Sequence, residues 1–597
     1  MIPAIFVFVY LSIVLYIGIF AFRKGTGSRD DFFLANRSLG PYIFVLSLFG
    51  TNMTAFAILG SSGLAYQRGI GVYGLMASSS GFVIPMTLFF IGTRLWHLGK
   101  KFGHMTQVQY FRDRWECSFI GTIIFALTAA MLVPYLIIGT MGGGTTLELI
   151  STVMDDNGKP VMVQVYNEDG SPRMEPVLVQ KIVDGKPTPQ RVPKIDENGN
   201  PVMKPKMEFK HWVSYEVGAA IVALVVMSYV FFGGMRGTAW VNTFQTVLFL
   251  TFGTAAFILI GNRLGGFDAI MEKMAANPST APLLSRQRIP MEEFFSYTFI
   301  PLSSIMFPHI AIMCMTAEKV SSFKKTVIFY PICILLIWLP SVFLGVIAAG
   351  QFPGLKAGET DDVILRMLTA HTDTWVSGIL GAGIMACVMA SDSQILALCT
   401  MFTEDVFVYY GGKKKYGEKA TVWTGRAFVV AIGLFAYTMA MSLKDEANIF
   451  ELAIRFAFSG FASLAPIMLA ALFWKRSTKW GALAATVWVT ITMLGTWYLY
   501  SRTTGIAPKP GQPPVQIFES LGNMFLRTPG NVTIYGYLPV MPMCIGSAVV
   551  MFFVSLLTPP PSKATIDKYF PPREKSAAAG TPPVNANTNV PEGAPAR

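Results

Sequence analysis

Thirteen long apolar stretches divide the 597-residue chain, and lysine and arginine concentrate in every second gap between them. A helix needs about 20 consecutive apolar residues to cross a bilayer, and cytoplasmic gaps collect basic side chains. We therefore expect a multi-pass protein of the plasma membrane, with its N-terminus outside and its C-terminus in the cytoplasm. The expected spans are roughly 3–22, 41–64, 71–93, 118–150, 213–233, 238–260, 293–317, 326–350, 376–410, 422–442, 448–473, 481–500 and 533–557.

The composition agrees with a membrane protein, because 52% of the residues are hydrophobic and only 14% are charged. The formal net charge of +12 falls in the expected cytoplasmic gaps and the tail. It is therefore interpreted as a topology signal, and no nucleic-acid partner is expected. The 6 cysteines show no metal-ligand spacing, and we find no nucleophile–base pair or phosphate-binding loop, so an enzyme is disfavoured.

The chain is expected to form one transporter-like membrane domain over residues 1–557, followed by a disordered cytoplasmic tail at 558–597. An outer loop at 152–211 interrupts this domain. It contains four Asp-Gly or Asn-Gly turn signals separated by short alternating stretches such as VMVQVY, a pattern typical of tight hairpins. We expect a small β-ribbon insertion outside the membrane, serving as a rigid cap or a partner-binding element.

Two expected spans contain residues that interrupt a helix. In the second span, Gly50, Thr51, Asn52 and Thr54 form a small, polar, poorly helical patch, which indicates either an unwound point or close helix packing. In the seventh, Pro308 breaks the hydrogen-bond ladder beside His309, an ionisable group at membrane depth. Unwound points in membrane helices supply carbonyls for ions and helix ends for solutes.

The ninth span carries Asp392 in the stretch MASDSQILALCTMFTEDVF. A carboxylate inside a membrane helix is costly and usually marks an ion or solute pathway. The alternative is a structural role, in which the carboxyl is protonated or hydrogen-bonded and holds two helices together.

Four stretches, taken in order, carry a resemblance to a known family: FFLANRSLGPYIFVLSLFGTNMTAFAILGSSGLAYQRG at 32–69, FFGGMRGTAWVNTFQTVLF at 231–249, MASDSQILALCTMFTEDVF at 389–407 and LFWKRSTKWGALAA at 472–485. They resemble the sodium/solute symporter family, which includes the sodium/proline, sodium/pantothenate and sodium/glucose cotransporters. The resemblance implies an all-α integral membrane protein of the leucine-transporter type, with inverted five-helix repeats at about 41–260 and 293–473.

The resemblance also implies a sodium site between the second and ninth spans. Its carbonyl ligands fall on Gly50, Met53 and Ala386. The two hydroxyl ligands of the family fall on Met389 and Ala390, which lack a hydroxyl, and Ser391 and Asp392 follow as possible replacements. An acidic residue of many relatives is Asn242 here. These departures put sodium coupling in doubt while leaving the family resemblance intact.

On the solute side, the sugar-binding acid and amide of the glucose transporters fall on Phe56 and Ala57, which disfavours a sugar. The expected solute pathway comprises Asn52, Thr54, Phe56, His309 and Arg455. Arg455 is either an anion-binding or gating residue, or it snorkels to the interface with Glu451 as its partner four residues earlier.

The leading interpretation is a secondary active transporter that moves a small organic solute with sodium as the coupling ion. The alternatives are a proton-coupled or uncoupled carrier of the same fold that uses Asp392 and His309, and a transport-deficient sensor. The identity of the solute, the stoichiometry and the oligomeric state are left open by the sequence.

Overall fold

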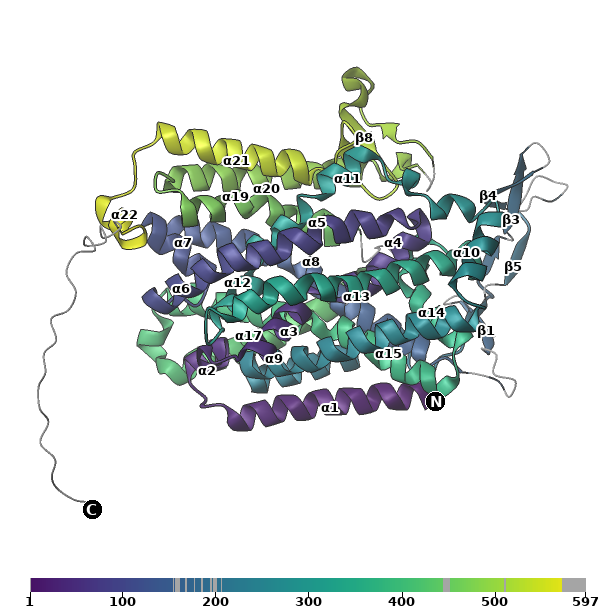
Figure 1. Ribbon diagram of the computed structural model, residues 1–597, viewed down its shortest axis with the longest axis horizontal. Helices are drawn as coiled ribbons and strands as arrows, with labels where there is room; N and C mark the ends of the chain where they lie inside the picture. Colours follow the sequence, from purple (N-terminus) through teal and green to yellow (C-terminus); the bar gives the residue numbers. More distant parts are fainter. Residues whose placement is uncertain are drawn as a thin grey trace, which may run out of the picture.

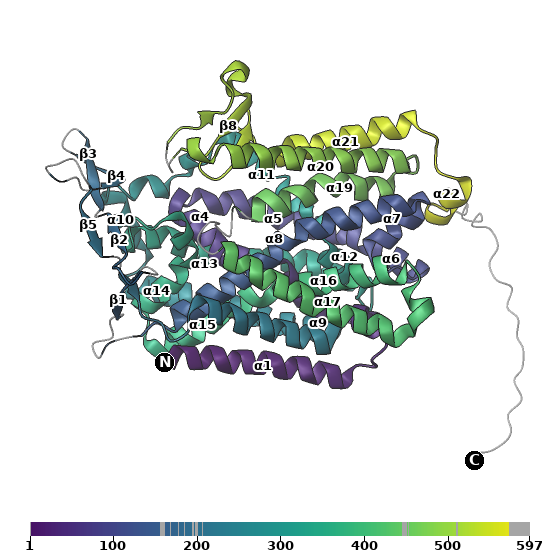
Figure 2. The same cartoon turned by 180° about the vertical axis from the view of Figure 1, so that it is seen from behind.

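A computed structural model describes the chain apart from Met1, several short gaps between residues 154 and 206, residues 444–450 and 452, residues 509–511, and residues 572–597. Its long helices lie side by side along one direction, so the ends of the bundle face opposite ways (Figure 1). The N-terminus and the strands β1–β5 lie at one end, here called the ribbon end, and α7 and α22 lie at the other, the tail end (Figure 2).

The helices of the bundle are α1 (Ile2–Lys24), α3 (Pro41–Asn52), α4 (Ser61–Arg68), α5 (Gly71–Thr87), α6 (Thr93–Phe102), α8 (Ser118–Ile150), α9 (Tyr215–Arg263), α12 (Pro308–Met315), α13 (Ser322–Gln351), α15 (Thr374–Val388), α16 (Asp392–Met401), α17 (Gly412–Leu443), α19 (Ser459–Phe473), α20 (Lys479–Arg502) and α21 (Val540–Leu557). Shorter helices connect or flank them: α2 (Arg29–Leu34), α7 (Gln107–Trp115), α10 (Phe267–Ala276), α11 (Met291–Tyr297), α14 (Val363–His371) and α22 (Lys563–Tyr569).

The described residues contain ten helices that are long and apolar enough to cross a membrane, and two bent helix pairs that qualify together. The 49-residue helix α9 counts as two crossings, because Gly234 leaves helical geometry at φ 50° and the chain turns back there. Tyr229 and Asn242, on either side of this turn, hydrogen-bond to the adjacent residues Asp392 and Ser393. With α9 as a hairpin and each bent pair as one span, the thirteen expected crossings are all present in the described residues.

Large apolar side chains remain exposed on the outer helices of the bundle. Ile328 of α13, Ile491 and Leu494 of α20, and Phe553 of α21 are each more than half exposed. A water-soluble surface rarely carries so many exposed apolar side chains, whereas lipid tails favour them. The protein is therefore a multi-pass membrane protein.

The insertion between α8 and α9 forms antiparallel ribbons within its described residues. Its strands are β1 (Met162–Gln164), β2 (Met174–Pro176), β3 (Leu178–Val183), β4 (Lys186–Pro193), β5 (Met203–Pro205) and β6 (Met207–Phe209). They pair as β1 with β6, β2 with β5 and β3 with β4, in the nested order of a long hairpin. A second, three-stranded sheet follows α20 and consists of β7 (Val515–Gln516), β8 (Phe525–Arg527) and β9 (Val532–Ile534).

The tail departs from the expected disorder at 558–597, because residues 563–569 form the helix α22. Ser562 caps this helix, and Tyr569 is 4% exposed against α6 and α7. A few aromatic and polar anchors hold a segment that is too short to bury a core of its own. The expectation for residues 572–597 lies outside the described residues.

Candidate functional site

The second expected span is broken at its middle. Helix α3 ends at Asn52, Met53 takes an extended conformation (φ −104°, ψ 100°), and a π-helical turn, η2 (Phe56–Gly60), leads into α4. The two halves meet at an angle of 58°. Small and β-branched polar residues hold a helix poorly, so the break falls where the sequence predicted an unwound point.

A second break lies in the seventh expected span. The 3₁₀ helix η6 (Ile300–Ile305) follows α11, and α12 begins at Pro308, with an angle of 46° between the halves. Proline lacks an N–H and suits the first position of a helix, so it terminates one half and starts the other. Both breaks therefore lie in the interior of the bundle, one in each half of the chain.

A carboxylate cluster lies beside the first break. Asp392 is fully buried, and it accepts hydrogen bonds from Tyr229 Oη at 2.9 Å and from Ser393 Oγ at 3.1 Å. Asn242 Nδ2 donates to Ser393 Oγ at 2.7 Å and to Thr51 Oγ1 at 3.1 Å. Because Ser393 has one proton and gives it to Asp392, Thr51 donates to Ser393 across their 2.9 Å contact.

Three amide oxygens around this cluster have no hydrogen-bond partner among the described residues: Asn242 Oδ1, Gln245 Oε1 and Gln394 Oε1. All three side chains are fully buried. An unsatisfied buried acceptor costs about 1–3 kcal/mol, which a bound cation would recover. The carboxylate of Asp392 and these amide oxygens are hard oxygen donors, which is the ligand type that a cation such as sodium prefers.

The expected sodium ligands lie in two neighbouring places. Met53 faces α15, and the carbonyl oxygens of Met53 and Thr54 accept from Cys387 Sγ at 3.7 and 3.2 Å. Ala386 immediately precedes this cysteine. Gly50 packs on α9, where an added Cβ would lie 2.4 Å from Thr246 Oγ1.

The rest of the expected ligand set lies around a local distortion of the ninth span. Met389, Ala390 and Ser391 form the 3₁₀ turn η8 between α15 and α16. The Ser391 side chain lies against Gly139 of α8, while Asp392 joins the cluster with Tyr229. The structure thus brings Asp392 to Thr51 of the broken helix through Ser393, and it places Ser391 beside α8.

Sequence reasoning did not assign several members of this cluster to the site. Thr51 lies in the polar patch of the second span and Ser393 follows Asp392, so their hydroxyls could have identified them as candidate ligands. Tyr229 and Gln245 gave no signal, because only the hairpin of α9 brings both of its arms to the cluster.

A cavity of about 30 Å³ lies between the two breaks. It is lined by Asn52, Met53, Phe56, Ser80, Ile84, Tyr297, Ile300, Pro301, Ser303, Ser304, Phe307, Trp338 and Phe458. A cavity of this size holds about one or two water molecules, so the walls must separate to admit an organic solute. The expected pathway residues Asn52 and Phe56 line it, whereas Tyr297 and Trp338 were not anticipated.

The other expected pathway residues lie outside this lining. His309 is 2% exposed and packs on Phe307, with 4.8 Å between ring centroids. Arg455 Nη2 donates to Gly530 O at 2.6 Å and to Glu451 Oε2 at 3.3 Å, and its guanidinium lies 3.4 Å from the Tyr500 ring centroid. Arg455 thus has the expected Glu451 partner and joins the start of α19 to the loop between β8 and β9.

Ion pairs close the tail end of the bundle. Arg29 forms a two-pronged contact with the buried carboxylate of Glu404, in which Nε lies 2.6 Å from Oε1. Arg112 Nη1 lies 3.6 Å from Asp405 Oδ1, and Thr106 Oγ1 donates to the same oxygen at 3.0 Å. These contacts tie α2 and α7 to the segment that continues α16.

Contacts at the ribbon end close the opposite side. Arg68 donates to both carboxylate oxygens of Glu293, at 2.5 and 2.6 Å, and Tyr66 Oη donates to Phe352 O at 2.7 Å. These contacts join α4 to α11 and to the end of α13 at the ribbon end.

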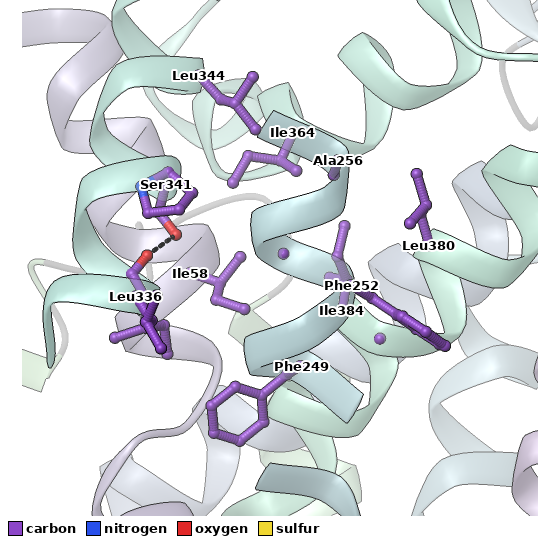
Figure 3. Close-up of a pocket in the computed structure, with 14 residues that line it drawn as sticks. Ile58, Phe249, Phe252, Ala256, Leu336, Ser341, Leu344, Ile364, Leu380 and Ile384 are labelled. Carbon is purple, nitrogen blue, oxygen red and sulfur yellow. Dashed lines mark hydrogen bonds between the residues drawn. The ribbon is translucent and has the colours of Figure 1, made fainter. Parts of the chain in front are cut away.

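A second gap of about 10 Å³ lies between α9, α13 and α15 (Figure 3). Its lining is almost entirely aliphatic and aromatic, and the hydroxyl of Ser341 is bonded to Ile337 O at 2.7 Å. An apolar space of this size offers no orienting group to a solute, so it is not the candidate site.

Comparison with known proteins adds three findings. The model of the sodium:solute symporter family matches residues 32–154 and 209–488. Sodium/proline symporters of Staphylococcus aureus strains USA300 and NCTC 8325 / PS 47 are 23% identical to this chain over 585 residues, covering 93% of each protein.

Among solved structures, a Na⁺-coupled sialic acid symporter in a substrate-bound outward-open state has a TM-score of 0.66 and 13% identity, covering 94% of this chain and 99% of that one. A nucleobase-cation-symport-1 family transporter in a closed conformation has a TM-score of 0.50 and 12% identity, covering 90% and 97%. Both have the leucine-transporter fold, so the expected fold class is confirmed.

Proposed function

The chain belongs to the sodium:solute symporter family, and on that premise we propose that it moves a small organic solute across the membrane together with sodium, by alternating access. The observation that carries the proposal is the buried cluster of Asp392, Ser393 and Thr51 beside a broken helix. Its orphaned amide oxygens include Asn242 Oδ1. In a purely structural cluster these acceptors would be expected to have partners.

Sodium fits this cluster through the residues that surround it. The carboxylate of Asp392 supplies the charge. The hydroxyl of Thr51 and the orphaned amide oxygens supply neutral ligands. The ion holds α16, α9 and the broken helix α3 together, so its arrival and departure change the contact between the first half of the chain and the second. The alternative ligands Met53 O and Ala386 O stay a prediction, with Cys387 as the competing donor at Met53.

The ion pairs at the two ends of the bundle support alternating access. Arg29–Glu404 lies at the tail end and Arg68–Glu293 at the ribbon end, so each end has its own contact that can open separately. A carrier needs such independent closures, because a cavity open to both sides would leak.

Proton coupling is the second candidate. It is favoured by the hydrogen bond from Tyr229 Oη to Asp392 and by the absence of hydroxyls at Met389 and Ala390. In that case Asp392 takes up and releases a proton, and the orphaned amides accept from it or from water.

The two candidates differ in a measurement that needs no knowledge of the solute. We expect sodium chloride to raise the melting temperature of the purified protein relative to potassium chloride at equal ionic strength, at several pH values around neutral. Asp392→Asn removes the sodium effect. A wild-type protein stabilised by acid and indifferent to sodium would instead identify the proton carrier.

The orientation in the membrane is proposed from the basic residues alone, with the N-terminus and the ribbon outside. Ser171 is exposed in the ribbon insertion and offers a site for a reporter cysteine. We expect Ser171→Cys to react with a membrane-impermeant maleimide in intact cells. Reaction only after permeabilisation would reverse the orientation.

A further inference from the structure

The two helix breaks differ from an open ion-binding site in one respect, which is that their carbonyl oxygens are already occupied by side chains of the protein. Tyr135 Oη donates to Asn52 O at 3.1 Å, and Gln107 Nε2 donates to Met306 O at 2.9 Å. Cys387 Sγ covers the carbonyls of Met53 and Thr54. These four backbone carbonyls at the breaks therefore each have a donor already.

Around the cavity, some side-chain hydrogen-bond donors have no acceptor. Trp338 lines the cavity and is 3% exposed, and its Nε1–H has no partner among the described residues. An indole nitrogen is a donor only, so it can be satisfied only by an acceptor. Both ring nitrogens of His309, in the first turn of α12, are likewise buried without a partner.

The backbone adds further donors at the same place. Phe307, the residue before α12, lines the cavity. Pro308 has no N–H, but the amides of His309 and Ile310 in the first turn have no acceptor within the helix, and the helix dipole favours negative charge there. No lysine, arginine, aspartate or glutamate is among the residues that line the cavity, so its polar groups are neutral.

From this imbalance we propose that the transported solute presents acceptor oxygens, as a carboxylate or a carbonyl, on an apolar body and carries no cationic amine, with Trp338 as the residue that selects for the acceptor. An oxygen of the solute accepts from Trp338 Nε1, and its apolar part lies against Phe56, Phe307 and Phe458. A zwitterionic amino acid is disfavoured, because its ammonium would lose water and would compete with Tyr135, Gln107 and Cys387 for the break carbonyls. The proposal rests on the proposed transport function and narrows its substrate.

Four five-carbon compounds test this selection on the purified, full-length protein in sodium: pentanoate, pentanamide, norvaline and pentylamine. We expect pentanoate or pentanamide to bind, and norvaline and pentylamine to bind at least about tenfold more weakly, as the loss of one buried hydrogen bond to a polar group implies. If only pentanoate binds, the site selects a negatively charged acceptor. If pentanamide binds equally well, a neutral carbonyl is sufficient.

Trp338→Phe keeps the ring and removes the donor, so it should weaken binding of the acceptor compounds about tenfold. Trp115→Phe is the matched control, because Trp115 Nε1 is also buried and unpartnered but lies in α7, away from the cavity. It should leave binding unchanged. Melting curves without solute check that both variants fold.

The inference is overturned if norvaline binds as tightly as pentanoate and pentanamide, if none of the four compounds binds, or if Trp338→Phe has no more effect than Trp115→Phe. A different result would contradict the transport proposal. If the acceptor compounds bind equally with and without sodium, and if no ion gradient drives them into proteoliposomes, the protein is selective for acceptors but is not a symporter.

Discussion

Asn242 shows how much a single amide can decide in this site. Its Nδ2 donates to both Thr51 and Ser393, while its Oδ1 has no partner among the described residues. The carboxyl of the cluster is that of Asp392, which accepts from Tyr229 and Ser393. The negative charge of the cluster is thus carried by α16, and α9 contributes the neutral amide of Asn242.

Because Ser393 links Asn242 to Asp392, we predict that the carboxylate and the amide can exchange places. The double variant Asn242→Asp/Asp392→Asn moves the carboxylate to α9 and keeps the net charge of the cluster, so we expect it to retain sodium-dependent stabilisation. Asp392→Asn alone should abolish that stabilisation, because no charge then compensates the buried cation. Melting temperatures in sodium and in potassium measure both. A double variant as insensitive to sodium as the single one would argue that Asp392 acts through its bond with Tyr229.

Among the secondary-structure elements, α8 and η8 make a very close contact. Gly139 allows the two segments to approach so closely that an added Cβ would lie 2.0 Å from Ser391 Oγ. A side chain there must push η8 away, and with it the neighbouring Asp392.

We therefore expect Gly139→Ala to lower the free energy of unfolding by about 1–3 kcal/mol, the usual cost of overpacking. Gly253→Ala in α9 is the control, since nothing lies within 4 Å of its added Cβ. That change should be neutral or stabilising by up to about 1 kcal/mol. Thermal unfolding in detergent compares the two, and equal melting temperatures would mean that η8 shifts without cost.

Helix α22 is attached through Asp113 of α7. This carboxyl has a hydrogen bond with His104 at 3.2 Å, and it accepts from Lys568 at 2.5 Å and from Tyr569. The His104 contact is the largest of the causes that hold the pKa of Asp113 well below its usual range, with the bonds from Lys568 and Tyr569 acting in the same direction.

A lowered pKa means that Asp113 favours docking of α22 at pH values above its unfolded pKa of about 4, and that this contribution is lost as the pH falls further. We expect the distance between spin labels on α22 and α7 to broaden in acid. Asp113→Asn should give a broad distribution at every pH. A narrow distribution in acid would show that the aromatic contacts of Tyr569 suffice.

The sequence predicted elements better than contacts. Hydrophobic spans and proline breaks are local properties, so the thirteen crossings and both broken helices could be anticipated, including the start of α12 at Pro308. Asp392 could be singled out because a lone charge in an apolar span is conspicuous. Trp338 could not, because an indole in a membrane helix looks like ordinary packing until the structure shows that it lines a cavity and that its Nε1 has no partner among the described residues. The docking of α22 depends on a few side-chain contacts that no periodicity reveals.

At the scale of the whole molecule, ion pairs at both ends of the bundle join segments that are far apart in the sequence. The contact between Arg29 and Glu404 joins α2 to the segment after α16, 375 residues away in sequence. Removing it should favour opening at the tail end, since the Arg68–Glu293 contact at the ribbon end is left intact.

We expect Glu404→Gln to raise, several-fold, the rate at which a cysteine in place of Ser303 reacts with a maleimide supplied from the tail side. The charge reversal Arg29→Glu/Glu404→Arg should restore slow labelling, because it restores the pair. Arg263→Gln is a control for loss of a surface ion pair, since Arg263 and Asp373 are both more than half exposed. Equal labelling in all variants would place the tail-end closure in Arg112 and Thr106 instead.

The small cavity between the breaks has a mechanical consequence. At about 30 Å³ it has room for one or two water molecules. Any solute that binds between the breaks must therefore displace the aromatic side chains of Phe56, Phe307 and Phe458, which belong to three different segments of the chain. Binding there would couple the positions of these three segments.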